Sequence, residues 1–285
     1  IHSSLANIQY NSLEHSSCIG NYLKISRELT QKERFQLAYS FFVLQEYDKS
    51  SLIFKKLMSE KSVYKPSSTY YFSHIQYKKS LYESALNGFE SLASEEKFSA
   101  ISSYYIVQIL FKQEKFERLL DYISINLNDI IPTRKSEVYR IMAESYYQLK
   151  DYRKALLNVE KAISMYKGKN RIPKEQWYNL ARFLYFDKND ITSAVNILEE
   201  LIKYYPKKQY WVQLSHLYGE QKKEDRQLST METAYVQEFL DRGTEQVTMA
   251  YLYLNGDVPY KAAKVLDKGL DVSIEKSFAE HLGSS

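Results

Sequence analysis

The sequence repeats itself at an interval of about 34 residues, and this interval constrains the fold more than any other feature. Small or apolar residues recur at gaps of 35, 34, 36, 38, 34 and 35, at Ala38, Ser73, Val107, Ala143, Ala181, Ser215 and Ala250. A second series follows 12 or 13 residues later, at Ser50, Ala85, Leu119, Ala155, Ala194, Gln227 and Ala262. Such a period predicts stacked copies of one supersecondary unit.

Each copy is predicted to be a pair of antiparallel helices. Only 8 Gly and 5 Pro occur in 285 residues, which leaves long uninterrupted segments that suit helices. Small residues let two helices approach closely, while large apolar neighbours fill the space beside them. The recurring DYRKA segment at 151–155 is then the corner of a hairpin, with Tyr152 and Ala155 turned inward and the charged residues in water.

This pattern resembles the tetratricopeptide repeat. The copy that matches it best reads WYNLARFLY at 177–185, then SAVNILEEL at 193–201, then Pro206. The resemblance covers roughly residues 31–276 and implies an all-α fold, a right-handed α-solenoid of about seven helical hairpins. Four repeats are expected in 31–167 and three in 168–276.

The ends of the chain are expected to differ from the repeats. Residues 1–30 have apolar residues at helical spacing, so we expect a capping helix or a partial repeat there. Residues 277–285 are expected to form a C-terminal tail, which begins an eighth unit that is cut short.

The two halves of the chain resemble two different families of repeat protein. Residues 35–157 resemble exported repeat proteins of Bacteroidetes-type bacteria, and residues 174–271 resemble the repeat protein of gammaproteobacterial TonB-system gene clusters. The change falls near YKGKNRIP, residues 166–173. We hypothesise a joint between sub-domains, or a fusion, at this point; one divergent natural protein is the alternative.

The resemblance implies that the first helix of each repeat lines a concave groove. Residues one turn either side of the small position would then face a partner, and Tyr and Arg are typical of protein interfaces. The candidate partner-binding residues are Tyr39, Phe42, Tyr70, His74, Tyr77, Tyr104, Gln108, Phe111, Arg140, Glu144, Tyr147, Tyr178, Arg182 and Tyr185. The alternative for each ring is packing against a neighbouring hairpin.

A protein or peptide partner is therefore expected, bound by a scaffold without enzymatic activity. Some proteins of this family clamp a terminal carboxylate with Lys and Asn, but the comparable positions here hold Phe35, Tyr39, Tyr71, Ile101 and Tyr105. A structural spacer that associates with copies of itself is the main alternative. The resemblance implies a bacterial periplasm or cell envelope, with the cytoplasm as the other location, and a TonB-type transport assembly as a setting.

Other classes of function lack their signatures. The sequence has no phosphate-binding loop, no zinc-protease helix and no serine-hydrolase elbow, and Cys18 lies in no nucleophile motif. Its five histidines show no ligand spacing, so neither a metal nor a cofactor is expected. A net charge of +4 is too mild to predict nucleic-acid binding, although an RNA-binding helical repeat stays a minor alternative because tyrosines can stack on bases. No apolar run is long enough to insert into a membrane.

Overall fold

The structure is a computed structural model that describes residues 1–240 and 243–268. Within these ranges the backbone forms helices joined by turns and loops, and no strand occurs. The predicted all-α fold is therefore confirmed. The expected tail at 277–285 and the end of the last predicted repeat at 269–276 lie outside the described residues.

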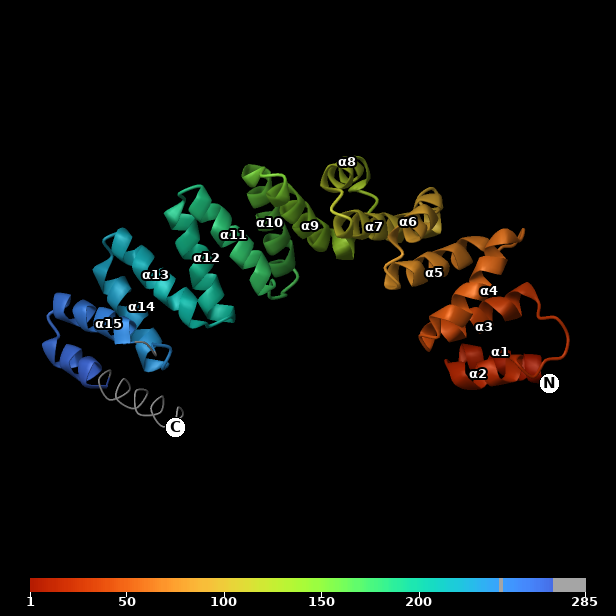
Figure 1. Ribbon diagram of the computed structural model, residues 1–285, viewed down its shortest axis with the longest axis horizontal. Helices are drawn as coiled ribbons and strands as arrows, with labels where there is room; N and C mark the ends of the chain where they lie inside the picture. The colour runs from red at the N-terminus through yellow and green to blue at the C-terminus, as the bar shows by residue number, and fades with distance from the viewer. Residues whose placement is uncertain (241–242, 269–285) are drawn as a thin grey trace, which may run out of the picture. The chain divides into compact units, whose positions relative to one another are not determined.

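The chain divides into two compact units, Ile1–Asn158 and Val159–Ser285. The division falls inside α10 (Tyr152–Lys167), before the joint predicted at 166–173. A fusion at that joint stays a prediction. Each unit is a series of helical hairpins (Figure 1).

The helices follow the predicted repeat. Unit 1 contains α1 (His2–Asn11), α2 (His15–Tyr22), α3 (Gln31–Val43), α4 (Tyr47–Ser59), α5 (Lys65–Lys78), α6 (Tyr82–Ser91), α7 (Glu96–Lys112), α8 (Phe116–Asn126), the short η1 (Pro132–Arg134), α9 (Lys135–Gln148) and the first half of α10. Unit 2 continues with the rest of α10, α11 (Glu175–Asp187), α12 (Ile191–Tyr204), α13 (Lys208–Glu220), α14 (Glu224–Val236), α15 (Gly243–Asn255) and helical backbone over 259–268.

The small residues lie where two helices touch. All seven members of the first series are buried, and Ala38 in α3 is completely buried. The partner position in α4, Ser50, is also completely buried, and its Oγ donates to the Ala38 carbonyl oxygen at 2.8 Å. The predicted role of these positions, to let the two helices of a hairpin pack closely, is confirmed.

One departure from the small-residue pattern is matched by a glycine. Gln227 in α14 stands where the other repeats have a smaller side chain, and Gly219 lies opposite it in α13. A Cβ added to Gly219 would come within 2.7 Å of the Gln227 side-chain nitrogen. The larger side chain therefore occupies space that the glycine leaves open.

Each hairpin turns through the same backbone motif. After α3, the Glu46 amide donates to the Phe41 carbonyl at 2.9 Å and the Gln45 amide donates to the Phe42 carbonyl at 3.0 Å. These are the two hydrogen bonds of a Schellman motif. Gln45, the first residue after the helix C-cap, has a φ of 61°. The corresponding positive-φ corner residues of the later hairpins are Ser80, Glu114, Lys150, Asn189, Lys222 and Asp257.

The corner at DYRKA shows why the segment recurs. The Asp151 carboxylate accepts a hydrogen bond from the Lys154 backbone amide at 3.1 Å, which caps the start of α10. Ala155 is completely buried, Tyr152 is half-buried and Arg153 is exposed. The prediction of an inward apolar side and a solvated charged side is confirmed.

Residues 1–30 form a complete hairpin, α1 and α2, that packs against α3. Glu33 of α3 holds this hairpin against α3. The Glu33 carboxylate accepts hydrogen bonds from Ser3 of α1 and from Arg27, the latter at 2.7 Å. The Thr30 side chain and the Glu33 side chain also complete a capping box at the start of α3. The N-terminal region is therefore an additional hairpin of the stack.

Candidate partner-binding surface

The first helices of unit 1 carry most of the residues predicted to contact a partner. These helices are neighbours, because α3 contacts α5, α5 contacts α7 and α7 contacts α9. The predicted residues on them are all partly buried: Tyr39, Phe42, Tyr70, His74, Tyr77, Tyr104, Gln108, Phe111, Arg140, Glu144 and Tyr147. Seven of these, which we call the aromatic face, are Tyr39, Phe42, Tyr70, His74, Tyr77, Tyr104 and Phe111.

The rings of α3 and α5 pack against one another through Tyr71. The Tyr71 ring lies 5.2 Å from that of Tyr39 and 5.1 Å from that of Phe42, measured between centroids. Phe42 also lies 5.3 Å from the His74 ring. Tyr71 is not among the predicted contact residues. Its ring stacks on the core ring of Phe54, with centroids 5.5 Å apart, and so joins this end of the aromatic face to the core.

Tyr105 has the same role between α5 and α7. Its ring lies 5.2 Å from His74, 5.3 Å from Tyr77 and 5.8 Å from Tyr104. It stacks on the completely buried Phe89 with ring centroids 4.7 Å apart. Burial raises the pKa of Tyr105, so its hydroxyl stays neutral.

His74 lies in the middle of this aromatic network. Burial, with a smaller effect of the nearby Lys78 charge, lowers the pKa of its imidazole to about 4. Its Nδ1 atom is buried and has no hydrogen-bond partner among the described residues. The imidazole is therefore neutral at physiological pH and packs as an aromatic ring.

Two arginines cover the far end of the aromatic face. The Arg134 guanidinium lies 5.3 Å from the centroid of the Tyr104 ring, and that of Arg140 lies 5.6 Å from Phe111. Arg140 also pairs with Glu137 and Glu144, at 2.9 and 2.6 Å. Burial alone would lower the pKa of Arg140, but these two carboxylates raise it, so the guanidinium stays charged.

Two lysines at the ends of α5 and α7 complete the charge pattern. Lys78 and Lys112 are exposed in the last turn of their helices. Neither forms an ion pair with a residue that the structure describes. Arg140 compensates only one of its two carboxylates. With these two lysines and Arg134, however, four cations stand against Glu137 and Glu144, so this part of the aromatic face has a positive excess.

In unit 2 two of the predicted contact residues lie in the core. Tyr178 is completely buried and Tyr185 is 9% exposed, so the expectation that they face an open groove is wrong. The reason is that each hydroxyl has a carboxylate partner, since Tyr178 donates to Glu200 at 3.2 Å and Tyr185 donates to Glu160. The third predicted residue, Arg182, is partly buried and its guanidinium lies 5.5 Å from the Tyr210 ring.

Polar side chains join α11 to α13 beside Arg182. The Asn179 amide donates to the Tyr210 hydroxyl at 2.9 Å, and that hydroxyl donates to Glu175 at 2.5 Å. Lys207 pairs with Glu175 at 2.7 Å. Where unit 1 has packed rings between its first helices, unit 2 has a row of hydrogen bonds.

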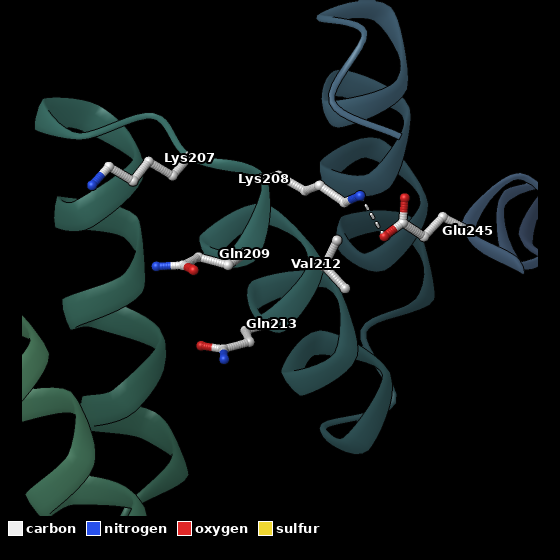
Figure 2. Close-up of a pocket in the computed structure, with 6 residues that line it drawn as sticks. All are labelled: Lys207, Lys208, Gln209, Val212, Gln213 and Glu245. Atoms are coloured by element: carbon white, nitrogen blue, oxygen red, sulfur yellow. Dashed lines mark ion pairs between the residues drawn. The ribbon is translucent and has the colours of Figure 1, made fainter. Parts of the chain in front are cut away.

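A pocket of about 450 Å³ lies next to this row, and we call it the amide pocket (Figure 2). Its lining residues are Lys207, Lys208, Gln209, Val212, Gln213 and Glu245. The sequence does not predict this pocket, because its glutamines belong to no recognised motif.

The described residues form no cluster of metal ligands. Among residues 1–240 and 243–268, no three His, Cys, Asp or Glu side chains come together to hold a metal ion. Cys18 is completely buried, and burial raises the pKa of its thiol. A helix with the length and apolarity of a membrane span is also missing from these ranges.

Solved structures share this fold. The C-terminal part of a TPR repeat-containing protein from Cytophaga hutchinsonii aligns with 94% of this chain and 98% of its own, with a TM-score of 0.55 and 15% identity. A tetratricopeptide repeat protein from Parabacteroides merdae aligns with 88% and 96%, with a TM-score of 0.52 and 15% identity. The apo form of RapI aligns with 87% and 99%, with a TM-score of 0.50 and 11% identity.

These likenesses confirm the predicted fold, an all-α solenoid of tetratricopeptide repeats. The Bacteroidetes origin of the first two is consistent with the resemblance of residues 35–157. At these identities the likeness shows the fold alone, and the link of residues 174–271 to TonB clusters stays a prediction. No protein-family model matches the sequence, and no curated protein matches it either.

Proposed function

We propose that the protein is a non-enzymatic interaction scaffold whose aromatic face in unit 1 holds a segment of another protein. The observation that carries this proposal is a row of partly exposed rings that runs over the adjacent helices α3, α5 and α7. Tyr rings offer a large contact area with a polar end at little cost in conformational entropy, which suits them to protein interfaces.

The charges around these rings favour one kind of partner. Lys78 and Lys112 are exposed and unpaired within the described chain, and Arg134 adds a cation above Tyr104. A segment with aromatic or aliphatic side chains and several carboxylates would be complementary to this surface, since its side chains would pack on the rings while its acids met the lysines. The envelope location and the TonB-type setting rest only on the resemblance of residues 174–271 and are part of this proposal.

The test is photocrosslinking from Tyr77 combined with charge reversal. With a photoreactive phenylalanine at position 77 of the full chain, one partner should be captured in the source cells. Lys78→Glu with Lys112→Glu should lower that capture about tenfold, because two attractive contacts become repulsive. Lys55→Glu with Lys56→Glu on α4 makes the same change in net charge on exposed side chains away from the rings and should leave capture unchanged.

The outcome can contradict the proposal in two ways. Equal losses in the two double variants would mean that net charge, not this surface, governs capture. If the only species crosslinked is a second copy of the chain, and sedimentation velocity shows reversible association, the alternative of a self-associating spacer is correct.

A further inference from the structure

Neighbouring hairpins of unit 1 contact each other through the same repeat positions. The α3 residues three before, one after and four after the small position Ala38 are Phe35, Tyr39 and Phe42. Their ring centroids lie 6.1, 5.2 and 5.1 Å from that of Tyr71 in α5. The three equivalent residues of α5 surround Tyr105 of α7 in the same way, at 6.4, 5.2 and 5.3 Å. These positions therefore receive the first helix of the next hairpin.

The second helix of each hairpin adds one residue to this contact, four after its own small position. Phe54 of α4 stacks on Tyr71 with ring centroids 5.5 Å apart, and Phe89 of α6 stacks on Tyr105 at 4.7 Å. From α4 to α14 the residues at this position are all buried: Phe54, Phe89, Ile123, Val159, Leu198 and Met231. The next hairpin thus covers four equivalent positions of the hairpin before it.

The hairpin formed by α15 and residues 259–268 has apolar side chains at all four positions, and all four are exposed. Val247, Tyr251 and Leu254 of α15 are 42%, 64% and 47% exposed, and Leu266 is 39% exposed. We call these four residues the α15 face. Contiguous exposed apolar side chains mark interaction sites in soluble proteins. Their repeat positions indicate what kind of element fits there, which is the first helix of another hairpin.

The N-terminal hairpin has a first helix with a matching open side. Ala6 is its small position, because it is completely buried and Leu13, seven residues later, has the positive φ of a corner residue. In later first helices, the residues one before and two after the small position pack against the preceding hairpin. In α3 these are Leu37, which belongs to a core cluster with Cys18 of α2, and Ser40, whose hydroxyl lies 3.5 Å from the Cys18 sulfur.

In α1 these two positions hold Leu5 and Ile8, which are 41% and 59% exposed. We call them the α1 face. Charge does not oppose a contact between the two faces, since α1 contains no Asp, Glu, Lys or Arg. The one charged residue of α15, Glu245, is paired with Lys208 at 2.8 Å.

We infer that the α15 face binds the α1 face of a second copy of the chain, so that copies associate head to tail. The observation that selects this occupant is that one chain carries both halves of the contact, each in the register that its own hairpins use. The interface is heterologous, because the two copies contribute different surfaces, and each bound copy keeps one face open for a further copy. This inference does not rest on the aromatic face.

Two variants of the full chain, each blocked at one face, test the inference. Leu5→Lys with Ile8→Lys puts two charges on the α1 face, and Tyr251→Lys with Leu254→Lys puts two on the α15 face. In sedimentation velocity over a range of concentrations, the parent chain should form dimers and longer species. Each double variant alone should associate at least about tenfold more weakly. An equimolar mixture should form a one-to-one dimer, because each variant retains the face that the other lacks.

Matched variants separate this contact from general surface effects. Leu52→Lys with Leu157→Lys makes the same change at exposed leucines of α4 and α10 and should leave association unchanged. Lys78→Glu with Lys112→Glu should also leave it unchanged, so failure of the aromatic face as a binding site would not affect this result.

The mixing step also shows that the blocked variants are folded, since a misfolded chain could not restore the dimer. A monomeric parent chain would overturn the inference and assign the α15 face to another occupant, a later segment of this chain or a helix of another protein. Dimers in either double variant alone would overturn it in favour of a symmetric contact, and a mixture that stays monomeric would overturn the pairing of the two faces.

Discussion

Single residues decide how the N-terminal hairpin is held, and Glu33 is the clearest case. The Arg27 guanidinium, with hydrogen bonds from Ser3 and Thr30, holds the pKa of this carboxyl well below its usual range, although burial acts in the opposite direction. A carboxyl whose pKa is lowered in the folded state stabilises that state above its unfolded pKa of about 4.3 and loses the contribution as the pH falls below it.

Replacement of Glu33 tests this assignment. Glu33→Gln should lower the free energy of unfolding by about 1–2 kcal/mol at pH 7, since charge-assisted hydrogen bonds are lost. The difference between variant and parent should shrink progressively as the pH falls from about 4.3 toward the lowered pKa of the folded state. Urea unfolding at pH 7, 5 and 3.5 measures both effects, with Glu14→Gln at an exposed position as the control. A constant difference across this pH range would show that the ionisation of Glu33 does not stabilise the hairpin.

The face on which a tyrosine lies could not be predicted from its position in the repeat. Tyr70 and Tyr178 stand three residues before the small position in their helices, as Ser73 and Ala181 show, yet the first is partly exposed and the second is completely buried. The deciding contact is a carboxylate from another helix, Glu200 in α12, which satisfies the buried hydroxyl of Tyr178. A repeat pattern gives the register along a helix and does not identify such a partner.

At the scale of the helix pair, the sequence predicted nearly all of the architecture. The small positions and the corner residues recur with the period, so the hairpins from α3 onward could be located before the structure was known. The N-terminal hairpin was predicted as one capping helix or a partial repeat, because α1 and α2 lack the repeated pattern. The amide pocket depends on which side chains α13 and α15 bring together, and no spacing rule contains that information.

Close approach within a hairpin leads to a prediction about glycine. A Cβ added to Gly88 in α6 would lie 1.9 Å from the Ser73 hydroxyl oxygen, whereas one added to Gly20 in α2 would meet nothing within 4 Å. Ser73 is completely buried and donates to the Thr69 carbonyl at 2.7 Å, so it cannot move away freely. Gly88→Ala should therefore destabilise the chain by about 1–3 kcal/mol.

Gly20→Ala is the matched control, and it should be neutral or stabilising by up to about 1 kcal/mol because alanine favours helix over glycine. Thermal unfolding followed by circular dichroism compares the two variants. If both substitutions raise the melting temperature, the contact between α5 and α6 tolerates a methyl group and the helices are not held at their observed separation.

For the whole molecule, the division into two units predicts two unfolding events. In repeat architectures each hairpin contacts mainly its neighbours, so stability is approximately a sum of local terms. Both tryptophans, Trp177 and Trp211, belong to unit 2, while Ile106 is completely buried in the core of unit 1. Tryptophan fluorescence thus reports unit 2, and circular dichroism reports both units.

Ile106→Ala should remove about 2–5 kcal/mol from unit 1 by leaving a cavity in its core. In this variant the unfolding transition followed by circular dichroism should broaden toward lower urea concentrations. The transition followed by tryptophan fluorescence should keep its midpoint. Leu198→Ala, which removes a completely buried side chain from unit 2, should shift the tryptophan transition instead. A tryptophan midpoint that moves equally in both variants would mean that the chain unfolds as one cooperative block.

The position of Cys18 makes its thiol a reporter of contact between α2 and α3. Its sulfur lies under α3, 3.5 Å from the Ser40 hydroxyl, and it is the one cysteine of the chain. The thiolate is the reactive form, and a buried thiol with a raised pKa forms little of it. Alkylating reagents therefore reach this sulfur only after α2 has separated from α3, and the rate at which the native protein is alkylated measures how often the N-terminal hairpin detaches from α3.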